Sequence, residues 1–498
     1  MTQLYEEVYD LAIIGGGLIG SAIARDAAGR GLTTFLCEQG DIGGASTAAT
    51  DRVVHGGLHH LGRLDWGTLR ARLKERDILM RMAPHLVRPL TFVLPHHQKL
   101  WPPWALRLGF FAYERLAGRT MPRTRYLDLS GRDADQALHL HFTAGFAFSD
   151  CLADDSRLAI ANAFDAQSRG ASVNPRLRCV VAERERDRWR LSLESQIDGQ
   201  WTVVLARMLI NAAGAQAGDV IDHVIHTSRH TPTRLTRFSQ IVVRRDYDRE
   251  VGYALPVASG RMVFAVPHAP GFMLIGPAVS RHEGDGGAEV TRRDIAWLLD
   301  VANQYFSEPV ARRDVVQGLA CVIAMPADGS LASGDHAVVV DALPGAPPLV
   351  SVFGSRLTTH RRIAEEVVDR LARFHEVLPP WTAEASLPGG NFPAHHGASH
   401  LGLALRAAYP FVSADYADRL VTTYGTRAPT ILTGARGFAD LGPCFGADLT
   451  AAEVDYLRHD EWAMTAEDVL WRRTRLGLRF TQGQAEALAA WMGEGAPA

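Results

Sequence analysis

The sequence lacks the features that mark several classes of protein. Its five cysteines show neither a Cys-x-x-Cys pair nor metal-ligand spacing, so we expect no metal site and reduced thiols in a cytoplasmic compartment. No stretch approaches the roughly twenty apolar residues of a transmembrane helix, and no signal-peptide pattern precedes the first strand-like segment. The formal net charge is only −3 and basic residues are spread along the chain, so nucleic acid is not an expected partner.

What remains is a long globular chain. Its 498 residues, 47% of them hydrophobic, exceed what one compact core holds and predict several domains. The pattern of strands and helices predicts an α/β cofactor domain, interrupted twice by an α+β substrate (cap) domain and followed by an all-helical domain. The expected boundaries are 1–73, 146–235 and 313–378 for the first domain, 74–145 and 236–312 for the second, and 379–498 for the third.

A glycine-rich stretch near the N-terminus has the spacing of a dinucleotide-binding turn. Asp10–Ile14 is a mostly apolar run of β type, and an Ala-rich helical segment follows the turn. Between them Gly15, Gly17 and Gly20 fall in the order Gly-x-Gly-x-x-Gly. In that setting Gly15 makes the sharp turn, Gly17 admits a pyrophosphate, and Gly20 lets helix and strand pack closely. An ordinary glycine turn is the alternative.

Three later positions extend this pattern. A second strand-like segment ends at Glu38, where a βαβ unit places the carboxylate that accepts ribose hydroxyls, although a solvated charge at a strand end is the alternative. Small-residue turns follow apolar strands at Asn211–Gly214 and at Phe353–Thr359. Either turn alone reads equally well as a helix cap. Together with Glu38 they favour FAD over a nicotinamide cofactor, which would not need the late turn.

A series of short motifs recurs in order along the chain. They lie at 15–17, 24–31, 55–58, 75–79, 83–86, 149–158, 211–214, 351–354, 387–390 and 471–474. In these motifs the chain resembles the FAD-dependent aerobic glycerol-3-phosphate dehydrogenases over nearly its whole length. The resemblance implies a Rossmann-like FAD domain of the glutathione-reductase type, a cap domain and a C-terminal helical domain. It also implies hydride transfer from a carbinol to flavin N5, with quinone at the membrane surface as the electron acceptor.

The resemblance assigns cofactor roles to single positions. The ADP-binding positions are Gly15, Gly17, Gly20 and Glu38, and the pyrophosphate neighbours are Ser46 and Thr47. The strand that faces the adenine contains Val181, a small-residue turn contains Gly214, and the segment under the isoalloxazine contains Gly354, Leu357 and Thr358. The two hydroxyl residues read equally well as turn caps.

The substrate side departs from the family. His59-His60 stands where the family usually has Arg-Tyr, and Gln317–Val322 stands where the family has Ser-Gly-Val-Arg-Pro-Leu. The arginine that clamps the substrate phosphate in the family aligns with Ala320, which offers no charge. Three further differences fall at 238–240, 276–279 and 354–359. The resemblance therefore supports FAD more strongly than glycerol 3-phosphate.

Three kinds of side chain are candidates for the reaction. His55, His59 and His60 could accept the hydroxyl proton, although a structural histidine is the alternative for each of them. Gln240 could hydrogen-bond a neutral polar substrate. Arg356 keeps a positive charge where the family has lysine.

Three functions stay open on this basis. The first is oxidation of a polyol phosphate, glycerol 3-phosphate included, through a rearranged site. The second is oxidation of another small hydroxy or amino acid, with Arg356 pairing with its carboxylate. The third is a flavin-binding paralogue without turnover.

A segment at 101–111 combines aromatic, aliphatic and basic residues. It could lie in a membrane interface, which would place the protein peripherally on the inner membrane. A core helix of the cap domain is the commoner explanation. The oligomeric state stays open, a homodimer included.

Overall fold

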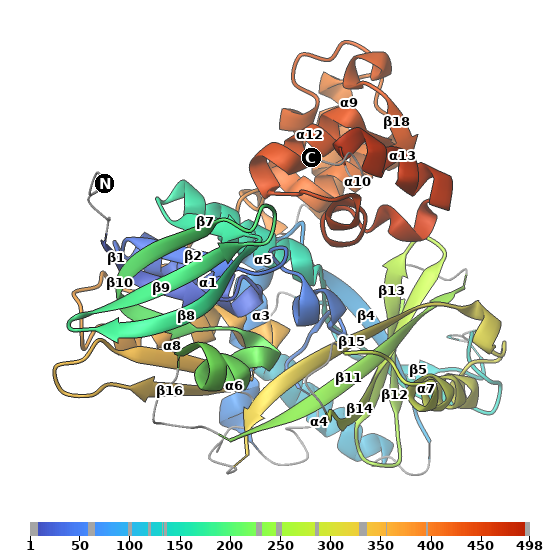
Figure 1. Ribbon diagram of the computed structural model, residues 1–498. Helices are drawn as coiled ribbons and strands as arrows, with labels where there is room; N and C mark the ends of the chain where they lie inside the picture. The colour runs from blue at the N-terminus through green and yellow to red at the C-terminus, as the bar shows by residue number, and fades with distance from the viewer. Residues whose placement is uncertain are drawn as a thin grey trace.

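The computed structural model describes most of the chain as three lobes. The described residues are 8–57, 65–97, 102–117, 121–131, 133, 137–225, 232–245, 251–283, 288–327, 336–354, 356–394 and 397–493. In Figure 1 a sheet with helices lies at the lower left, a second sheet lies at the lower right, and a helical domain stands above both. This arrangement agrees with the α/β, cap and helical regions expected from the sequence.

The first sheet has the strand order β16-β17-β10-β1-β2-β7, extended by β9 on β10 and β8 on β9. Its strands are β1 (Val8–Ile14), β2 (Thr34–Glu38), β7 (Ser172–Pro175), β8 (Leu177–Glu185), β9 (Arg188–Ser195), β10 (Trp201–Asn211), β16 (Ala337–Asp341) and β17 (Leu349–Phe353). β1 runs parallel to β2 and β10, and β10 runs parallel to β17. The carboxyl ends of these four strands therefore meet at one edge of the sheet.

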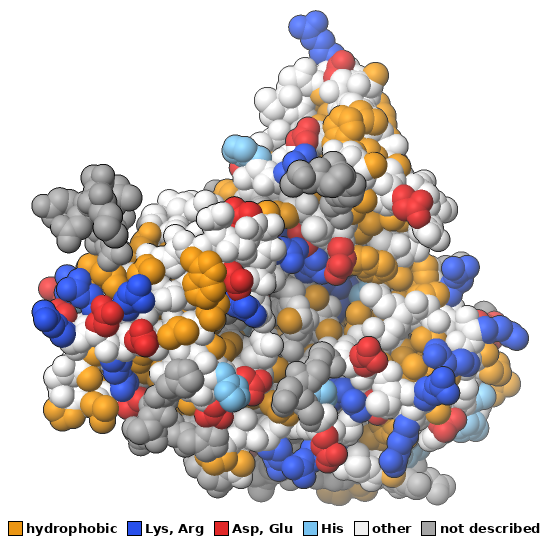
Figure 2. Space-filling model, in the orientation of Figure 1, with side chains coloured by type: hydrophobic (Ala, Val, Ile, Leu, Met, Phe, Trp, Pro, Cys, Tyr) orange, Lys and Arg blue, Asp and Glu red, His pale blue; other side chains and the backbone are white. Residues whose placement is uncertain are grey.

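Both faces of this sheet are covered. Leu11 and Ile13 of β1 pack into one apolar cluster, and Ala12 and Ile14 pack into another on the opposite face. The first cluster lies against α1 (Leu18–Gly29), α5 (Asp155–Ser168) and α8 (His360–Leu371). The second cluster includes residues of β8 and β9, whose exposed turn bears mixed basic and acidic side chains in Figure 2. Burial on both faces explains the continuous apolar run before the glycine turn.

The second sheet has the order β15-β11-β14-β13-β12-β4-β6-β3, with β5 on β6. Its strands are β3 (Val53–Val54), β4 (Val87–Pro95), β5 (Arg125–Asp128), β6 (Ala144–Ala153), β11 (Thr233–Arg244), β12 (Val251–Pro256), β13 (Met262–Ala269), β14 (Phe272–Arg281) and β15 (Val315–Pro326). Helix α7 (Arg292–Tyr305) covers one face, and α3 (Trp66–Met82) and α4 (Pro103–Ala117) complete this lobe.

Three strands of this sheet lie across the expected domain boundaries. β3, β15 and most of β6 carry residue numbers that the sequence assigned to the cofactor domain, yet all three pair in the second sheet. Alternation of apolar and polar residues identifies a strand without identifying its sheet, which explains the difference. The division into segments therefore remains a proposal at these strands.

The C-terminal domain is helical apart from one short strand pair. Its helices are α9 (Gly397–Ala408), α10 (Ala414–Tyr424), α11 (Ala428–Ile431), α12 (Ala451–Glu461) and α13 (Gln482–Met492). β18 (Cys444–Gly446) pairs with β19 (Leu449–Thr450), and a π-helical turn spans Asp468–Arg473. The domain has its own apolar core, separate from those of the two sheets.

Candidate active site

Four expected cofactor positions meet at the carboxyl edge of the first sheet. Gly15 follows β1, Glu38 ends β2, Gly214 lies in the turn after β10, and Gly354 follows β17. The three glycines have φ of 110°, 60° and 68°, a region that L-residues with side chains rarely adopt. Ligands of open α/β sheets bind at this edge, so the four positions share one site although they are distant in sequence.

The three glycines of the turn differ in what surrounds them. A Cβ at Gly15 would lie 2.5 Å from the carbonyl oxygen of Ala212, and one at Gly20 would lie 1.8 Å from the carbonyl oxygen of Gly15. A Cβ at Gly17 would meet only Thr47 Oγ1, at 3.2 Å, and Gly17 has an ordinary φ of −68°. The outer glycines are therefore required by packing, whereas the middle one leaves space for a ligand.

The open space at Gly17 adjoins the N-terminus of α1. The Leu18 amide donates to Thr47 Oγ1 at 3.1 Å, and the first turn contains no acidic residue. A helix N-terminus without a neighbouring carboxylate favours an anion such as a pyrophosphate. Thr47 lies beside this helix N-terminus, and its role next to a pyrophosphate stays a prediction.

Glu38 is held in place by backbone donors. The Gly16 amide donates to its Oε2 and the Gly40 amide to its Oε1, each at 2.7 Å. Burial raises the pKa of this carboxyl, and the two backbone bonds oppose that rise. Each carboxylate oxygen retains a lone pair, so Glu38 can still accept bonds from two ribose hydroxyls.

The contacts of Ser46 and the strand pairing of Val181 can be explained without a ligand. The Ser46 hydroxyl donates to the Val322 carbonyl at 2.9 Å and accepts from the Val322 amide at 3.2 Å. Ser46 therefore joins its loop to β15, which supports the alternative of a structural hydroxyl. Val181 lies in β8 at an irregularity of the β8–β9 register, where it pairs with Ser192. Its role beside the adenine stays a prediction.

His55 lies between the two sheets. Its amide donates to Thr358 Oγ1 at 3.3 Å, and its ring centroid is 6.0 Å from that of Phe264 on β13. Thr358 and Leu357 are buried in the short turn that follows Gly354. The segment expected under the isoalloxazine therefore contacts the histidine expected to accept a proton.

The Gln240 side chain lies on the face of the second sheet that also carries Phe264, the residue next to His55. Phe264 and Gly276 are paired residues of β13 and β14, so they share one face. The Gln240 side chain lies over Gly276, because a Cβ there would be 2.4 Å from Gln240 Cγ. Gln240 is 1% exposed, and its Oε1 has no hydrogen-bond partner among the described residues. A buried acceptor in this state points to a ligand that donates a hydrogen bond.

Ala320 lies on the face of the second sheet opposite to Gln240. It pairs with Ser239, whose hydroxyl donates to Asp294 of α7 at 2.9 Å. Paired residues share a face and successive residues alternate, so Ala320 faces α7 while Gln240 faces His55. An arginine at this position would therefore extend away from the proposed substrate space.

Asp51 was not among the residues expected from the sequence, and its carboxyl lies close enough to Arg356 to be influenced by that charge. Burial raises the pKa of Asp51 to about 6, while the Val53 amide and the Arg356 guanidinium lower it. Arg356 itself is exposed. Asp51 stands only four residues before His55, which was the one available signal. His59 and His60 lie outside the described residues.

The cysteines lie mostly in the interior of the described chain. All five cysteines are free, and only Cys444 is exposed. Burial raises the pKa of Cys321 to about 12, so this thiol is protonated at neutral pH. No group of three His, Cys, Asp or Glu side chains in the described ranges is arranged to hold a metal ion.

Comparison with known proteins covers both parts of the chain. Residues 10–370 match the family described as FAD dependent oxidoreductase, and 381–494 match the C-terminal domain of alpha-glycerophosphate oxidase. Glycerol-3-phosphate dehydrogenase of Pseudomonas aeruginosa is 40% identical over 98% of this chain and 95% of its own. D-erythritol 1-phosphate dehydrogenase of Brucella abortus is 35% identical over 97% and 98%. The structure of glycerol-3-phosphate dehydrogenase from Bacillus halodurans complexed with FAD aligns with a TM-score of 0.76 at 23% identity, covering 98% of this chain and 91% of that one.

Replacement of the middle glycine tests the position of the cofactor. Gly17→Val adds a side chain at a position where a Cβ would meet only the Thr47 hydroxyl, so we expect a folded protein that has lost its flavin. Gly20→Val is the matched variant, and it should fail to fold because its Cβ would overlap the Gly15 carbonyl. Flavin absorbance and circular dichroism of the purified variants measure both outcomes. A yellow Gly17→Val protein would contradict the assignment.

Asp51 predicts a pH-dependent stability. Its folded pKa of about 6 lies above its ordinary value, so the folded state binds the proton more tightly and loses stability as pH rises from about 4 to 6. Asp51→Asn removes this cost, and we expect it to raise the free energy of unfolding at pH 7 by about 1–3 kcal/mol. The gain should vanish near pH 4 in urea titrations.

The exposed carboxylate of Asp187 provides the control. Asp187→Asn should change the free energy of unfolding by less than about 0.5 kcal/mol at either pH. A loss of stability in Asp51→Asn at pH 7 would mean instead that the ionised carboxylate is stabilised by Arg356.

Proposed function

The chain belongs to the FAD-dependent glycerol-3-phosphate dehydrogenase family and is an FAD-dependent oxidoreductase, and from this premise we propose that it oxidises a secondary alcohol of a small polyol. The observation that supports this substrate class is the buried Gln240 Oε1, which needs a hydrogen-bond donor. A neutral hydroxyl supplies that donor. The relative named D-erythritol 1-phosphate dehydrogenase supports substrates beyond glycerol 3-phosphate within the family.

The proposed chemistry divides between cofactor and protein. Bound FAD supplies the hydride acceptor at flavin N5. His55 accepts the hydroxyl proton as a neutral imidazole while the carbinol carbon loses its hydride. Thr358 fixes the main chain of His55 and Phe264 contacts its ring, so two separate elements set the position of the base. Gln240 orients the substrate by accepting from one of its hydroxyls.

Arg356 gives the site a positive charge for an anionic end of the substrate. We propose that it pairs with a phosphate or a carboxylate, and the nearby Asp51 carboxyl moderates its charge. A polyol phosphate is the first candidate, and a hydroxy or amino acid is the second. A flavin-binding paralogue without turnover is the remaining alternative, and flavin reduction by any member of either class would eliminate it.

Glycerol 3-phosphate should be a poor substrate. A guanidinium–phosphate bond contributes about 1.5–3 kcal/mol, so a phosphate held in this site without the arginine of the family motif should bind about ten- to a hundredfold more weakly. We expect slow or undetectable anaerobic bleaching of the flavin by this compound. Ala320→Arg should recover little, because residue 320 faces α7. The assay is absorbance at the flavin band across a panel of polyols, polyol phosphates, hydroxy acids and amino acids.

Two further results decide between the candidates. Gln240→Leu should lower kcat/KM for the preferred substrate about tenfold or more while leaving FAD bound, because it removes one buried hydrogen-bond acceptor. Efficient reduction by glycerol 3-phosphate with a micromolar Michaelis constant would contradict the expectation that it is a poor substrate, and would mean that Arg356 alone binds its phosphate well.

The exposed surface of α4 supports a proposal for the location of the protein and for its electron acceptor. The described residues contain no helix long and apolar enough to cross a bilayer. α4 nevertheless exposes Trp104, Leu108 and Phe111, which are 71%, 63% and 54% accessible and lie on one helix face. This exposure is against the core-helix alternative. We propose that the face lies in the interface of the inner membrane, with Arg107 and Arg115 toward anionic lipid and quinone as the acceptor.

Liposome flotation tests this surface. Wild-type protein should float with anionic vesicles, and the variant Trp104→Gln, Leu108→Gln, Phe111→Gln should stay at the bottom of the gradient with unchanged turnover to a soluble dye. Leu140→Gln removes an apolar side chain elsewhere that is even more exposed, and this variant should still float. Wild-type protein that never floats would contradict the membrane proposal.

A further inference from the structure

One loop forms a wall of the cofactor site. This cofactor loop (residues 39–50) runs from the end of β2 to β3 and contains only one short helical turn of its own. Thr47 accepts from the Leu18 amide at 3.1 Å, and the Gly43 amide donates to the Gly16 carbonyl at 3.0 Å. The geometry at the glycine turn and at the start of α1 therefore depends on the conformation of this loop.

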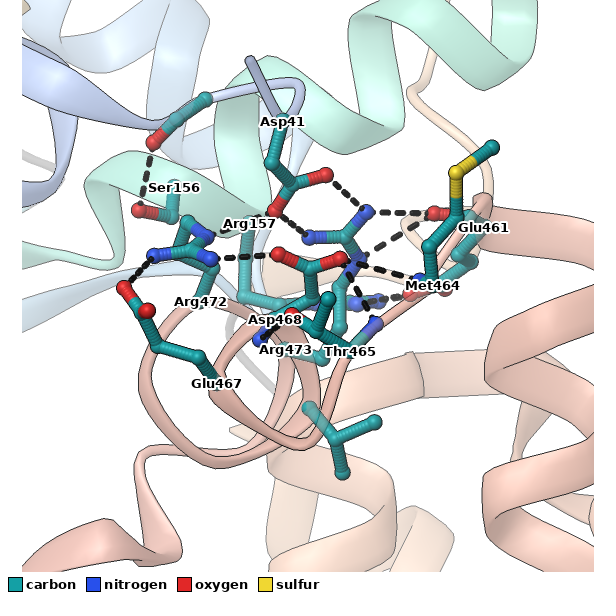
Figure 3. A network of polar contacts seen from close by, with 12 residues as sticks. Asp41, Ser156, Arg157, Glu461, Met464, Thr465, Glu467, Asp468, Arg472 and Arg473 are labelled. Carbon is teal, nitrogen blue, oxygen red and sulfur yellow. Dashed lines mark hydrogen bonds and ion pairs between the residues drawn. The ribbon is translucent and has the colours of Figure 1, made fainter. Parts of the chain in front are cut away.

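The C-terminal domain holds the first part of the loop through Asp41. Arg473 donates to both oxygens of this carboxylate, at 2.5 and 2.8 Å, and Arg472 donates to Oδ2 at 2.6 Å. The Arg473 and Asp41 side chains are 0% and 2% exposed. Figure 3 shows both guanidinium groups directed at Asp41, with Arg472 also joined to Asp468 and Glu467.

The same short stretch also holds the last part of the loop. Arg475 donates to Asp155 and, at 3.0 Å, to Asp154. Asp155 in turn accepts from the Thr50 hydroxyl at 2.7 Å and from the Thr50 amide at 3.3 Å. Burial opposes ionisation of Asp154, yet Arg475 and Arg52 lower its pKa to about 2. Residues 472–475 therefore hold the loop near both of its ends.

A second ion pair between the same two domains leaves the loop alone. Arg157 of α5 donates to both oxygens of Glu461, and both side chains are nearly buried. In the described part of the chain neither side chain bonds to residues 39–50. This pair offers a comparison of the same chemistry, burial and domain contact in which the side chains have no direct bond to the loop. The Glu461 carbonyl accepts from Arg473 at 2.6 and 3.2 Å, and a substitution of the Glu461 side chain leaves that carbonyl in place.

We propose that Arg472, Arg473 and Arg475 are positioning residues for the cofactor, so that the C-terminal domain sets the affinity for FAD without touching it. Asp41 and Asp155 transmit this effect to the loop. Ordering the loop before binding lowers the entropy that the ligand must overcome. Each guanidinium is buried against its carboxylate, so loss of one partner leaves an uncompensated charge beside the loop.

The change in FAD affinity depends on the fraction of protein in which the cofactor loop has its binding conformation. If the loop adopts its binding conformation only about a tenth of the time, the apparent dissociation constant rises about tenfold. A role limited to joining the domains predicts a different result, because loss of any buried pair at the interface would then lower stability and leave affinity unchanged.

The test is an FAD titration of apoprotein prepared from the full chain. Asp41→Asn should raise the FAD dissociation constant about tenfold or more, whereas Glu461→Gln should keep it within about twofold of wild type. Arg473→Lys preserves the charge and should fall between wild type and Asp41→Asn. Thermal unfolding of each apoprotein is recorded in parallel, so that affinity and stability are read separately.

The outcomes are distinct. Equal changes in FAD affinity for Asp41→Asn and Glu461→Gln would overturn the proposal, as would a lower apoprotein unfolding temperature for Asp41→Asn with unchanged affinity. If Asp41→Asn does not fold, Arg473→Lys against Glu461→Gln decides by the same criterion. None of these readouts depends on the substrate, so failure here is separate from failure of the proposed polyol oxidation.

Discussion

Parallel pairing of β1 with β2 and β10 is the constraint on which the rest of the structure depends. It brings the glycine turn, Glu38 and the Asn211–Gly214 turn to one edge, although the chain between them forms much of the second sheet. Parallel strands need long crossovers and helices or further strands on both faces. The cap strands are inserted into such crossovers, which places the substrate face of the second sheet opposite the cofactor edge.

Local spacing was sufficient to predict the strand, the glycine turn and the helix that surround the proposed cofactor position. A strand, a glycine turn and an Ala-rich helix determine their own geometry, and Gly15, Gly17, Gly20 and Glu38 lie where their spacing indicates. The substrate half depends on pairing between distant strands. Alternation along β15 does not tell which of its faces is directed at the cofactor edge. Ala320, which aligns with the arginine of the family motif, faces α7 instead.

Electrostatic features were the least predictable. The raised pKa of Asp51 results from burial, which a hydrophilic loop sequence does not indicate. The partners of Asp41 are 431 and 432 positions away, beyond any local pattern. The exposure of Trp104 could not be predicted from the sequence either. An amphipathic stretch has the same composition whether its apolar face contacts protein or lipid.

The separation between Asp41 and its arginines has a consequence for biosynthesis. A ribosome delivers the chain from the N-terminus, and early domains begin to fold during synthesis. The cofactor loop thus emerges hundreds of residues before the guanidinium groups that neutralise its buried carboxylate. Until residues 472–475 leave the exit tunnel, Asp41 must stay hydrated and the loop unsettled. If residues 472–475 set the affinity for FAD as we propose, tight binding of the flavin waits until they have been synthesised, and a product truncated before them binds it weakly.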